Sequence, residues 1–181
     1  MVFLLTEELA FPDPHNGDPD GLLAVGGDLS VDRLLLAYSN GIFPWYAFRQ
    51  GVIEWWCPLQ RFVIFPSEIH ISHSMRTLMN KGKYDITFNQ AFGKVIKACS
   101  DLRKDEEGAW LGEDMIKAYT TLHEQGFAAS VEVWEEDKLV GGLYGVAIGR
   151  CFFGESMFSL VPSASKLALI HLARFFEEHR G

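Results

Sequence analysis

A glycine-rich apolar stretch from Leu139 to Ser165 places the strongest constraint on how this chain can fold. Its glycines interrupt a run of apolar and aromatic residues at positions 141, 142, 145, 149 and 154. Glycine in the interior of a strand marks a bulge or a place where another group comes close to the backbone. The stretch therefore predicts neighbouring β-strands against which another part of the chain, or a ligand, packs closely.

A single acid, Glu155, lies in this apolar run between Phe153 and Phe158. A carboxylate that is held among aromatic rings loses hydration, so its presence needs a reason. Two interpretations follow. Either the glycines serve packing and Glu155 sits at a sheet edge, or Glu155 meets a ligand in a site. The pattern alone favours the first interpretation.

The composition excludes several classes of protein. Hydrophobic residues make up 48% of the 181 residues, which is typical of a globular chain that can form one domain or a small domain beside a larger one. The net charge of −8 argues against wrapping a long nucleic acid, although a local basic patch can still contact one end of it. The three cysteines are far apart, so we expect a reducing cytoplasm, no disulfide framework and no metal. No segment is long enough to span a membrane, and no membrane partner is expected.

The first part of the chain, residues 1–60, is predicted to form a small N-terminal domain. A helix is expected to start after Ser30, whose side chain can cap its first turn, and to stop at Gly41. The next segment, GIFPWYAF (41–48), is expected to be an aromatic loop because Pro44 prevents the helix from continuing. Its aromatic side chains serve either recognition or a small hydrophobic core.

Residues 61–181 are predicted to form a second, larger domain. Short strands are expected over 52–58, before the boundary, and over 61–65, after it. Further along, Asn89 is expected to cap an amphipathic helix, and EEDK (135–138) to be the turn of a hairpin. A last helix begins at Ser163 or Ser165. This order of elements predicts an α+β, or mixed α/β, fold built on a mixed sheet.

Two further features leave alternatives open. Trp110 lies in a charged segment and is either an anchor on the body of the protein or a stacking platform. Basic residues gather over 76–83 and 94–104, where a solvated face is the ordinary interpretation and phosphate binding the alternative.

General catalytic motifs are missing from the sequence. The segment Gly154-Glu155-Ser156-Met157-Phe158 is one glycine short of a nucleophile elbow. His70 and His73 have no cysteine or carboxylate to complete a metal-binding set, and no phosphate-binding loop or Rossmann fingerprint occurs. These patterns therefore point to no hydrolase, metalloenzyme or nucleotide-dependent enzyme.

Seven segments together resemble one family in their order and spacing: GLLAVGGDLS, GIFPWY, WWCP, EEGAWL, EVWEEDKLVGGLYGVAIG, FFGESMFS and SASKLAL. The chain resembles the bacterial leucyl/phenylalanyl-tRNA–protein transferases from about Leu22 to about Phe176. The resemblance implies an aminoacyltransferase that moves Leu or Phe from its tRNA to the N-terminal Arg or Lys of a protein or peptide. This marks the acceptor for N-end-rule degradation. It also implies a small N-terminal domain joined to a domain similar to GNAT acetyltransferases, and no cofactor.

The resemblance also implies roles for particular residues. Trp45 and Trp110 match tryptophans that hold the 3′-terminal adenosine of the tRNA, and Glu155 matches a catalytic glutamate near the aminoacyl group. The basic clusters become candidates for contact with acceptor-stem phosphates. The wall of the pocket for the aminoacyl side chain is expected to include Leu143, Phe152, Leu169, Leu172 and Phe176.

The sequence departs from the family in three places. Leu143 stands where a Met can occur, and Cys57 where a Ser is common. Family members continue past Gly181 with a strand that carries an Asp and a Gln. The expectation is therefore a fragment or short form that lacks its C-terminal strands and is impaired or inactive.

Two functions of other classes are alternatives to the transferase. An acyl-CoA-dependent N-acetyltransferase needs a glycine-rich pyrophosphate loop, whereas the corresponding segment here, LVPSAS (160–165), contains no glycine. A non-catalytic binder of charged tRNA ends would bind aminoacyl-tRNA without turnover.

Overall fold

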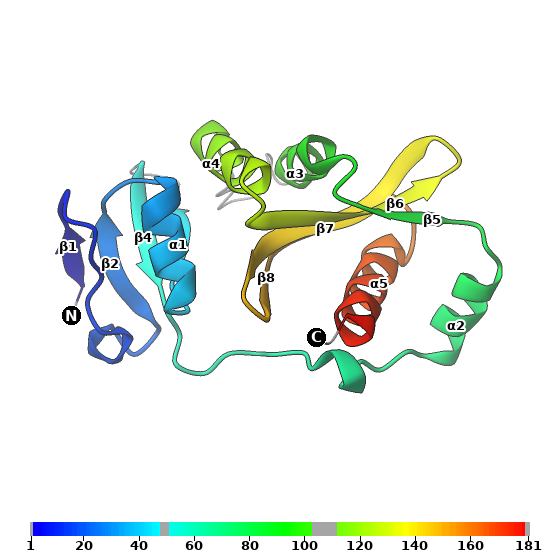
Figure 1. The fold of residues 1–181 in the computed structure, drawn as a ribbon, viewed down its shortest axis with the longest axis horizontal. Coiled ribbons are helices and arrows are strands. Elements are labelled where there is room, and N and C mark those ends of the chain that lie inside the picture. The colour runs from blue at the N-terminus through cyan, green and yellow to red at the C-terminus, as the bar shows by residue number, and fades with distance from the viewer. Residues whose placement is uncertain (1, 48–50, 103–111, 180–181) are drawn as a thin grey trace. The chain divides into compact units, whose positions relative to one another are not determined.

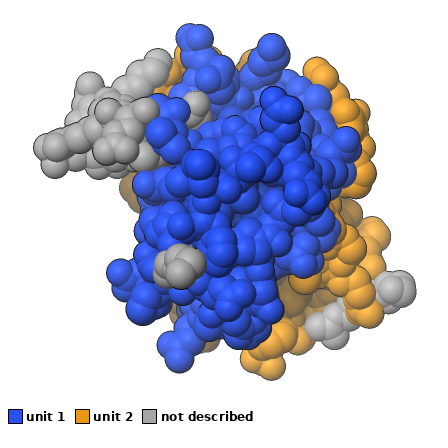
Figure 2. All heavy atoms as spheres, turned by 90° about the vertical axis from the view of Figure 1, so that its left-hand side faces the viewer, with its two compact units in different colours: residues 1–62, 103–122 blue, residues 63–102, 123–181 orange. Residues whose placement is uncertain are grey.

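A computed structural model describes residues 2–47, 51–102 and 112–179, apart from the side chains of Tyr46 and Ala47. The chain forms two compact units, which Figure 2 shows in separate colours. The first unit consists of residues 1–62 and 103–122, and the second of residues 63–102 and 123–181. The division after residue 62 lies beside the expected boundary near residue 60, but the later segment 103–122 joins the first unit.

The first unit is built on a mixed four-stranded sheet in the order β1–β2–β4–β3 (Figure 1). Strands β1 and β2 pair in parallel, and the other neighbours are antiparallel. The sheet has its hydrophobic core beside helix α1, where Leu23, Leu34, Tyr38, Ile42 and Trp55 are buried. The bounds are β1 Phe3–Leu5, η1 Pro14–Asn16, β2 Leu22–Gly26, α1 Val31–Ser39, β3 Phe43–Ala47 and β4 Val52–Trp56.

Helix α1 begins where the sequence predicts it. The Ser30 side chain accepts a hydrogen bond from the Arg33 backbone N–H, as expected for an N-cap. Asp28 accepts hydrogen bonds from the Ser30 N–H and the Arg33 Nε, and its pKa is lowered chiefly by the bonds to Ser30. The buried Arg33 guanidinium also donates to the carbonyls of Thr6 and Glu8, so it fixes the segment that follows β1.

Two predictions of local structure near the boundary are wrong. The aromatic segment predicted as a loop forms strand β3, which pairs with β4 along its whole length. Pro44 is tolerated there because β3 is an edge strand, where no further neighbour needs its missing N–H. The strand predicted over 61–65 does not form: these residues pair with no other strand, and Phe62 is 92% exposed.

The second unit contains the four-stranded sheet β5–β6–β7–β8, in which all neighbouring strands are antiparallel. Figure 1 shows α3 on one face of this sheet and α5 on the other. Helix α4 (Glu113–Glu124) lies mostly in the first unit. The bounds of the others are η2 Pro66–Glu68, α2 His73–Asn80, β5 Asp85–Phe88, α3 Phe92–Asp101, β6 Ala128–Glu135, β7 Lys138–Ile148, β8 Cys151–Ser159 and α5 Ala164–Glu178.

The predicted α+β fold with a small N-terminal domain is confirmed, but the position of the mixed sheet differs. The sequence places the mixed sheet in the larger domain, whereas the described parallel pair is β1–β2 in the first unit. A parallel neighbour in the larger sheet would need a strand after a crossover helix, and α5 is the last element that the structure describes.

Two further predictions concern the larger unit. The hairpin is confirmed, and β6 and β7 meet across Glu136, whose φ is 56°. The cap of α3 is corrected: the helix begins after Ala91, and Asn89 instead accepts a hydrogen bond from the Ser130 N–H of β6. Among the described residues, no helix has the length and apolar character needed to cross a membrane.

Candidate functional site

The glycines of β7 are required by close packing on both faces of the sheet. A Cβ on Gly141 would overlap Ala164 of α5, and one on Gly142 would lie 2.6 Å from the Val131 carbonyl oxygen. A Cβ on Gly145 would lie 2.6 Å from the Phe152 ring. Glycine is therefore what allows α5 and the Phe152 ring to approach this strand.

Glu155 occupies a β-bulge in the edge strand β8. In the pairing with β7, Tyr144 lies opposite Ser156 while the next residue, Gly145, lies opposite Gly154. Glu155 is thus the extra residue between two regular pairs, and it is half-buried. A bulge turns a side chain away from the regular alternation and is frequent beside active sites. The glycines of β7 serve packing and Glu155 lies at a sheet edge, as the first interpretation expected. The bulge also gives Glu155 a local geometry that suits a functional carboxylate.

The residues expected to line the aminoacyl pocket come together in one hydrophobic cluster. Its buried members include Leu143 of β7 and Leu172 of α5, which are 2% and 7% exposed. Phe152 of β8, and Leu169 and Phe176 of α5, are partly buried against them. The structure thus joins residues from three elements on the α5 face of the sheet.

The edge of this cluster is aromatic and partly open. The rings of Phe152 and Phe176 lie 6.1 Å apart between centroids, at an interplanar angle of 59°. Met157, which the sequence did not single out, lies opposite Leu143 in the β7–β8 pairing and is 44% exposed. The alternation along β8 could have indicated Met157, but the bulge shifts the register within this strand.

Of the two tryptophans assigned to adenosine binding, the structure describes one. Trp45 lies on the edge strand β3, is 44% exposed, and has its ring 6.5 Å from that of Trp56. Trp56 in turn donates from Nε1 to Glu54 at 3.1 Å. Trp45 therefore presents part of an indole ring on a supported strand. Trp110 lies outside the described residues.

Glu132 is a buried, hydrogen-bonded acid that the sequence analysis did not single out. It is fully buried on β6 and accepts hydrogen bonds from the hydroxyls of Thr87 and Ser130, both at 2.5 Å. It also accepts from the backbone N–H groups of Gln90 and Ala91, at 3.4 and 3.3 Å. Glu132 thus connects β5, β6 and the start of α3, and its alternation with apolar neighbours could have indicated an inward-facing acid.

The basic residues over 76–83 and 94–104 have different contacts: some form ion pairs, and one lies over an aromatic ring. Lys83 forms an ion pair with Glu135 at 2.9 Å, and Lys97 forms one with Asp101 at 3.0 Å. Lys94 lies over the Trp134 ring at 5.8 Å from its centroid. Arg103 and Lys104 lie outside the described residues. Within the described part of the chain, no group of three His, Cys, Asp or Glu side chains is arranged to hold a metal ion.

Comparison with protein families gives two adjacent matches. The model described as the leucyl/phenylalanyl-tRNA protein transferase N-terminal domain matches residues 27–59. The model described as leucyl/phenylalanyl-tRNA protein transferase matches residues 63–181, which is more than half of the chain. The second match begins where the second unit begins, at residue 63, but it also includes residues 103–122 of the first unit.

Individual relatives with the name leucyl/phenylalanyl-tRNA–protein transferase match nearly the whole chain. The protein of Thermodesulfovibrio yellowstonii is 55% identical over 169 residues, which are 93% of this chain and 68% of the relative. That of Syntrophobacter fumaroxidans is 52% identical over 94% of this chain and 73% of the relative. For Flavobacterium psychrophilum, the identity is 51% over 97% of this chain and 83% of the relative.

Proposed function

The chain belongs to the leucyl/phenylalanyl-tRNA–protein transferase family, which transfers Leu or Phe from tRNA to protein N termini, and we propose that its acceptors begin with Arg or Lys. Transfer to such an acceptor marks it for N-end-rule degradation. The net charge of −8 supports a cationic acceptor, because an acidic protein attracts a positively charged N terminus. We also propose a cytoplasmic location, because aminoacyl-tRNA is made and used there in translation.

The observation that carries the site assignment is the cluster on the α5 face beside the bulge at Glu155. Leu143, Phe152, Leu169, Leu172 and Phe176 pack in one apolar cluster. In this proposal, the cluster forms the wall that meets the Leu or Phe side chain of the donor. A charged side chain would lose its hydration against this wall and gain no partner in return. The cluster therefore supports selection of Leu and Phe by exclusion of polar side chains.

Glu155 is the residue that we assign to the reacting end of the donor. A half-buried carboxylate at a bulge is suited to accept hydrogen bonds from the α-ammonium of the aminoacyl group. Such a bond would fix the orientation of the adjacent ester carbonyl. Glu155 thus acts in the proposal by binding and orienting the donor.

The reaction itself needs no covalent intermediate. The neutral N-terminal amine of the acceptor attacks the ester carbonyl of the donor, a peptide bond forms, and the ester bond to the ribose breaks. The amine loses a proton, and the departing ribose oxygen gains one. Aminolysis of an ester is favourable, so holding the amine and the carbonyl in contact can supply much of the acceleration. The absence of a nucleophile motif from the sequence agrees with this chemistry.

The tRNA is held, in this proposal, at its 3′ end and its acceptor stem. Trp45 supplies a partly exposed ring on which the terminal adenosine can stack, with Trp110 assigned as the second ring. Arg76, Lys81 and Lys94 are candidates for phosphate contacts, together with Lys83 and Lys97, which would exchange their ion pairs for phosphate. Local basic groups of this kind allow RNA contact despite the negative total charge.

A panel of acceptor peptides tests the proposed specificity. The peptides are identical except for the first residue, which is Arg, Lys, Ala or Glu, and labelled Leu-tRNA is the donor. We expect kcat/KM for Arg and Lys to exceed that for Ala by about tenfold or more, the size of one charged hydrogen bond. Equal transfer to Ala would contradict the acceptor assignment.

The same assay tests Glu155. Glu155→Gln should lower kcat with Leu-tRNA while the preference for Arg over Ala persists, because the substitution affects the donor side. Glu136→Gln, in the exposed β6–β7 turn, is the matched control and should behave as wild type. Unchanged kcat in Glu155→Gln would remove Glu155 from the site.

A further inference from the structure

A pocket opens between α2, the β5 segment and α5, at other residues of the hydrophobic cluster that supplies the proposed donor site. Its volume is about 210 Å³, below the roughly 300–1,000 Å³ that is typical of pockets for drug-sized ligands. The lining consists of Leu78, Met79, Asn80, Tyr84, Ile86, Leu167, His171 and Arg174. None of the residues assigned to the donor belongs to this set. A ligand of this pocket must therefore be small.

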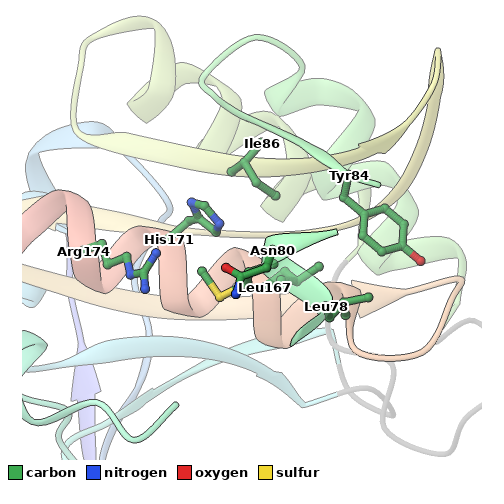
Figure 3. A pocket seen from close by; sticks show the side chains of 8 residues that line it. Leu78, Asn80, Tyr84, Ile86, Leu167, His171 and Arg174 are labelled. Atoms are coloured by element: carbon green, nitrogen blue, oxygen red, sulfur yellow. The ribbon is translucent and has the colours of Figure 1, made fainter. Parts of the chain in front are cut away.

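The lining combines basic and hydrogen-bonding side chains with apolar side chains. Leu167, His171 and Arg174 recur at helical spacing along α5, so that one helix supplies an apolar contact, an imidazole and a guanidinium. Figure 3 shows Arg174 at one end and Tyr84 at the other, with His171 and Asn80 between them. Among the described residues, no carboxylate lines the pocket. The lining thus offers hydrogen-bond donors and a positive charge beside apolar walls from Met79, Ile86 and Leu167.

These features distinguish the pocket from sites for the aminoacyl group of the donor and for the N-terminal residue of the acceptor. The carboxyl group of the donor amino acid is esterified to tRNA, so it has no negative charge for Arg174 to bind. The N-terminal Arg or Lys of the acceptor is cationic and would be repelled by the same guanidinium. The α-ammonium of a free amino acid would find no carboxylate partner among the lining residues.

We propose that this pocket binds a small carboxylic acid that has an apolar body and no amine. Its carboxylate lies between the Arg174 guanidinium and the His171 imidazole, and its hydrocarbon part contacts Met79, Ile86 and Leu167. Arginine is suited to this role because its planar fork matches a carboxylate.

Protonation of His171 adds a pH dependence to this site. Burial lowers the pKa of His171, the Arg174 charge lowers it further, and Glu178 on the same helix opposes both. The residues that face it from α2 are Leu78, Met79 and Asn80, which carry no charge, and the β5 segment contributes Tyr84 and Ile86. A bound carboxylate favours the imidazolium, so binding should tighten as the pH falls through the histidine range.

Methyl NMR of the full chain, with labelled Ile, Leu and Met, tests the proposal. The probe is 4-methylpentanoate, and its neutral isostere 4-methylpentanamide and the zwitterion leucine are compared with it. We expect saturable shifts of the Met79, Ile86 and Leu167 methyl signals, with an affinity for the carboxylate about tenfold above that for the amide. Absence of these shifts, or equal or tighter binding of the amide or of leucine, would overturn the proposal.

Substitutions distinguish the contribution of Arg174 to binding from that of His171. Arg174→Gln should weaken binding by about tenfold, whereas Arg150→Gln, an exposed arginine in the β7–β8 turn, should leave it unchanged. Between about pH 8 and about pH 5.5 the wild-type affinity should rise, and His171→Gln should abolish the rise. An Arg174→Gln protein that binds as tightly as wild type, or a pH dependence that persists without His171, would contradict the assignment.

Discussion

Gly145 shows how one residue can fix the geometry of the proposed donor site. The strand β7 passes beneath the Phe152 ring, and the ring reaches the backbone only because Gly145 has no side chain. Phe152 in turn packs against the cluster that includes Leu172 and Phe176. The position of the aromatic wall therefore depends on the absence of a single methyl group.

Gly145→Ala should consequently destabilise the protein by about 1–3 kcal/mol, the usual cost of overpacking. The Cβ would meet both the Phe153 carbonyl oxygen and the Phe152 ring, and the carbonyl belongs to backbone that cannot easily move. The measurement is the urea midpoint of unfolding. Gly154→Ala is the matched control, since Gly154 lies opposite Gly145 in β8 and a Cβ there would meet nothing within 4 Å. Equal effects of the two substitutions would refute this explanation.

At the scale of single residues, the sequence indicates which positions have a structural or functional role better than it indicates the local geometry that explains the role. Close approach explains Gly141, Gly142 and Gly145, whereas a Cβ on Gly149 or Gly154 would meet nothing within 4 Å. Glu155, the acid whose presence needs a reason, lies at a bulge. The bulge at Glu155 could not be predicted, because it appears only when β8 is aligned against β7. Asn89 was expected to cap a helix because Asn favours that position, but its side chain bonds across to β6 instead.

Glu132 acts at the scale of secondary-structure elements. Its carboxylate receives donors from β5, from β6 and from the turn that leads into α3. The Thr87 hydroxyl that donates to Glu132 also accepts from Trp134 Nε1, at 2.8 Å. One buried side chain thus ties the edge strand β5 and the start of α3 to the centre of the sheet.

Glu132→Gln should lower the free energy of unfolding by about 1–3 kcal/mol, because its NH₂ group would face donors and leave a buried N–H or O–H without an acceptor. Chemical denaturation with an unchanged m-value would report this loss. Glu136→Gln makes the same chemical change in the exposed turn and should stay within about 0.5 kcal/mol of wild type. A Glu132→Gln protein as stable as the control would mean that the network contributes nothing.

Some helices and strands follow correctly from the sequence and others do not, and the reason can be given for each. Helix α1 and the β6–β7 hairpin follow from capping and alternation, which are local signals. Strand β3 was missed because Pro44 argues against a strand, and only the sheet order shows that β3 lies at an edge. Residues 61–65 have strand-forming side chains but no neighbouring strand, and local propensity cannot reveal a missing partner.

At the scale of the whole molecule, the chain returns to its first unit after leaving it. Residues 103–122 belong with residues 1–62, and the buried hydroxyls of Tyr38 and Tyr119 form a hydrogen bond of 2.6 Å across this separation in sequence. A boundary near residue 60 could be stated as an expectation from composition and resemblance. The return of 103–122 could not, because it rests on contacts between residues far apart in the chain.

The five apolar residues assigned to the aminoacyl pocket also come together only when the whole second unit is folded. Period and composition assign Leu169, Leu172 and Phe176 to one helix face, but only the resemblance joined them to Leu143 and Phe152. The structure places all five in one cluster, and their role in binding the aminoacyl side chain remains a prediction.

The most direct test is transfer of labelled amino acid to a peptide that begins with Arg, with Leu-tRNA, Phe-tRNA and Lys-tRNA as alternative donors. An apolar wall accepts Leu and Phe, whereas a lysine side chain would have to lose the hydration of its ammonium group. We predict transfer of leucine and phenylalanine and no detectable transfer of lysine. Transfer of lysine at a rate similar to that of leucine would contradict the assignment of this cluster as the donor pocket of a leucyl/phenylalanyl transferase.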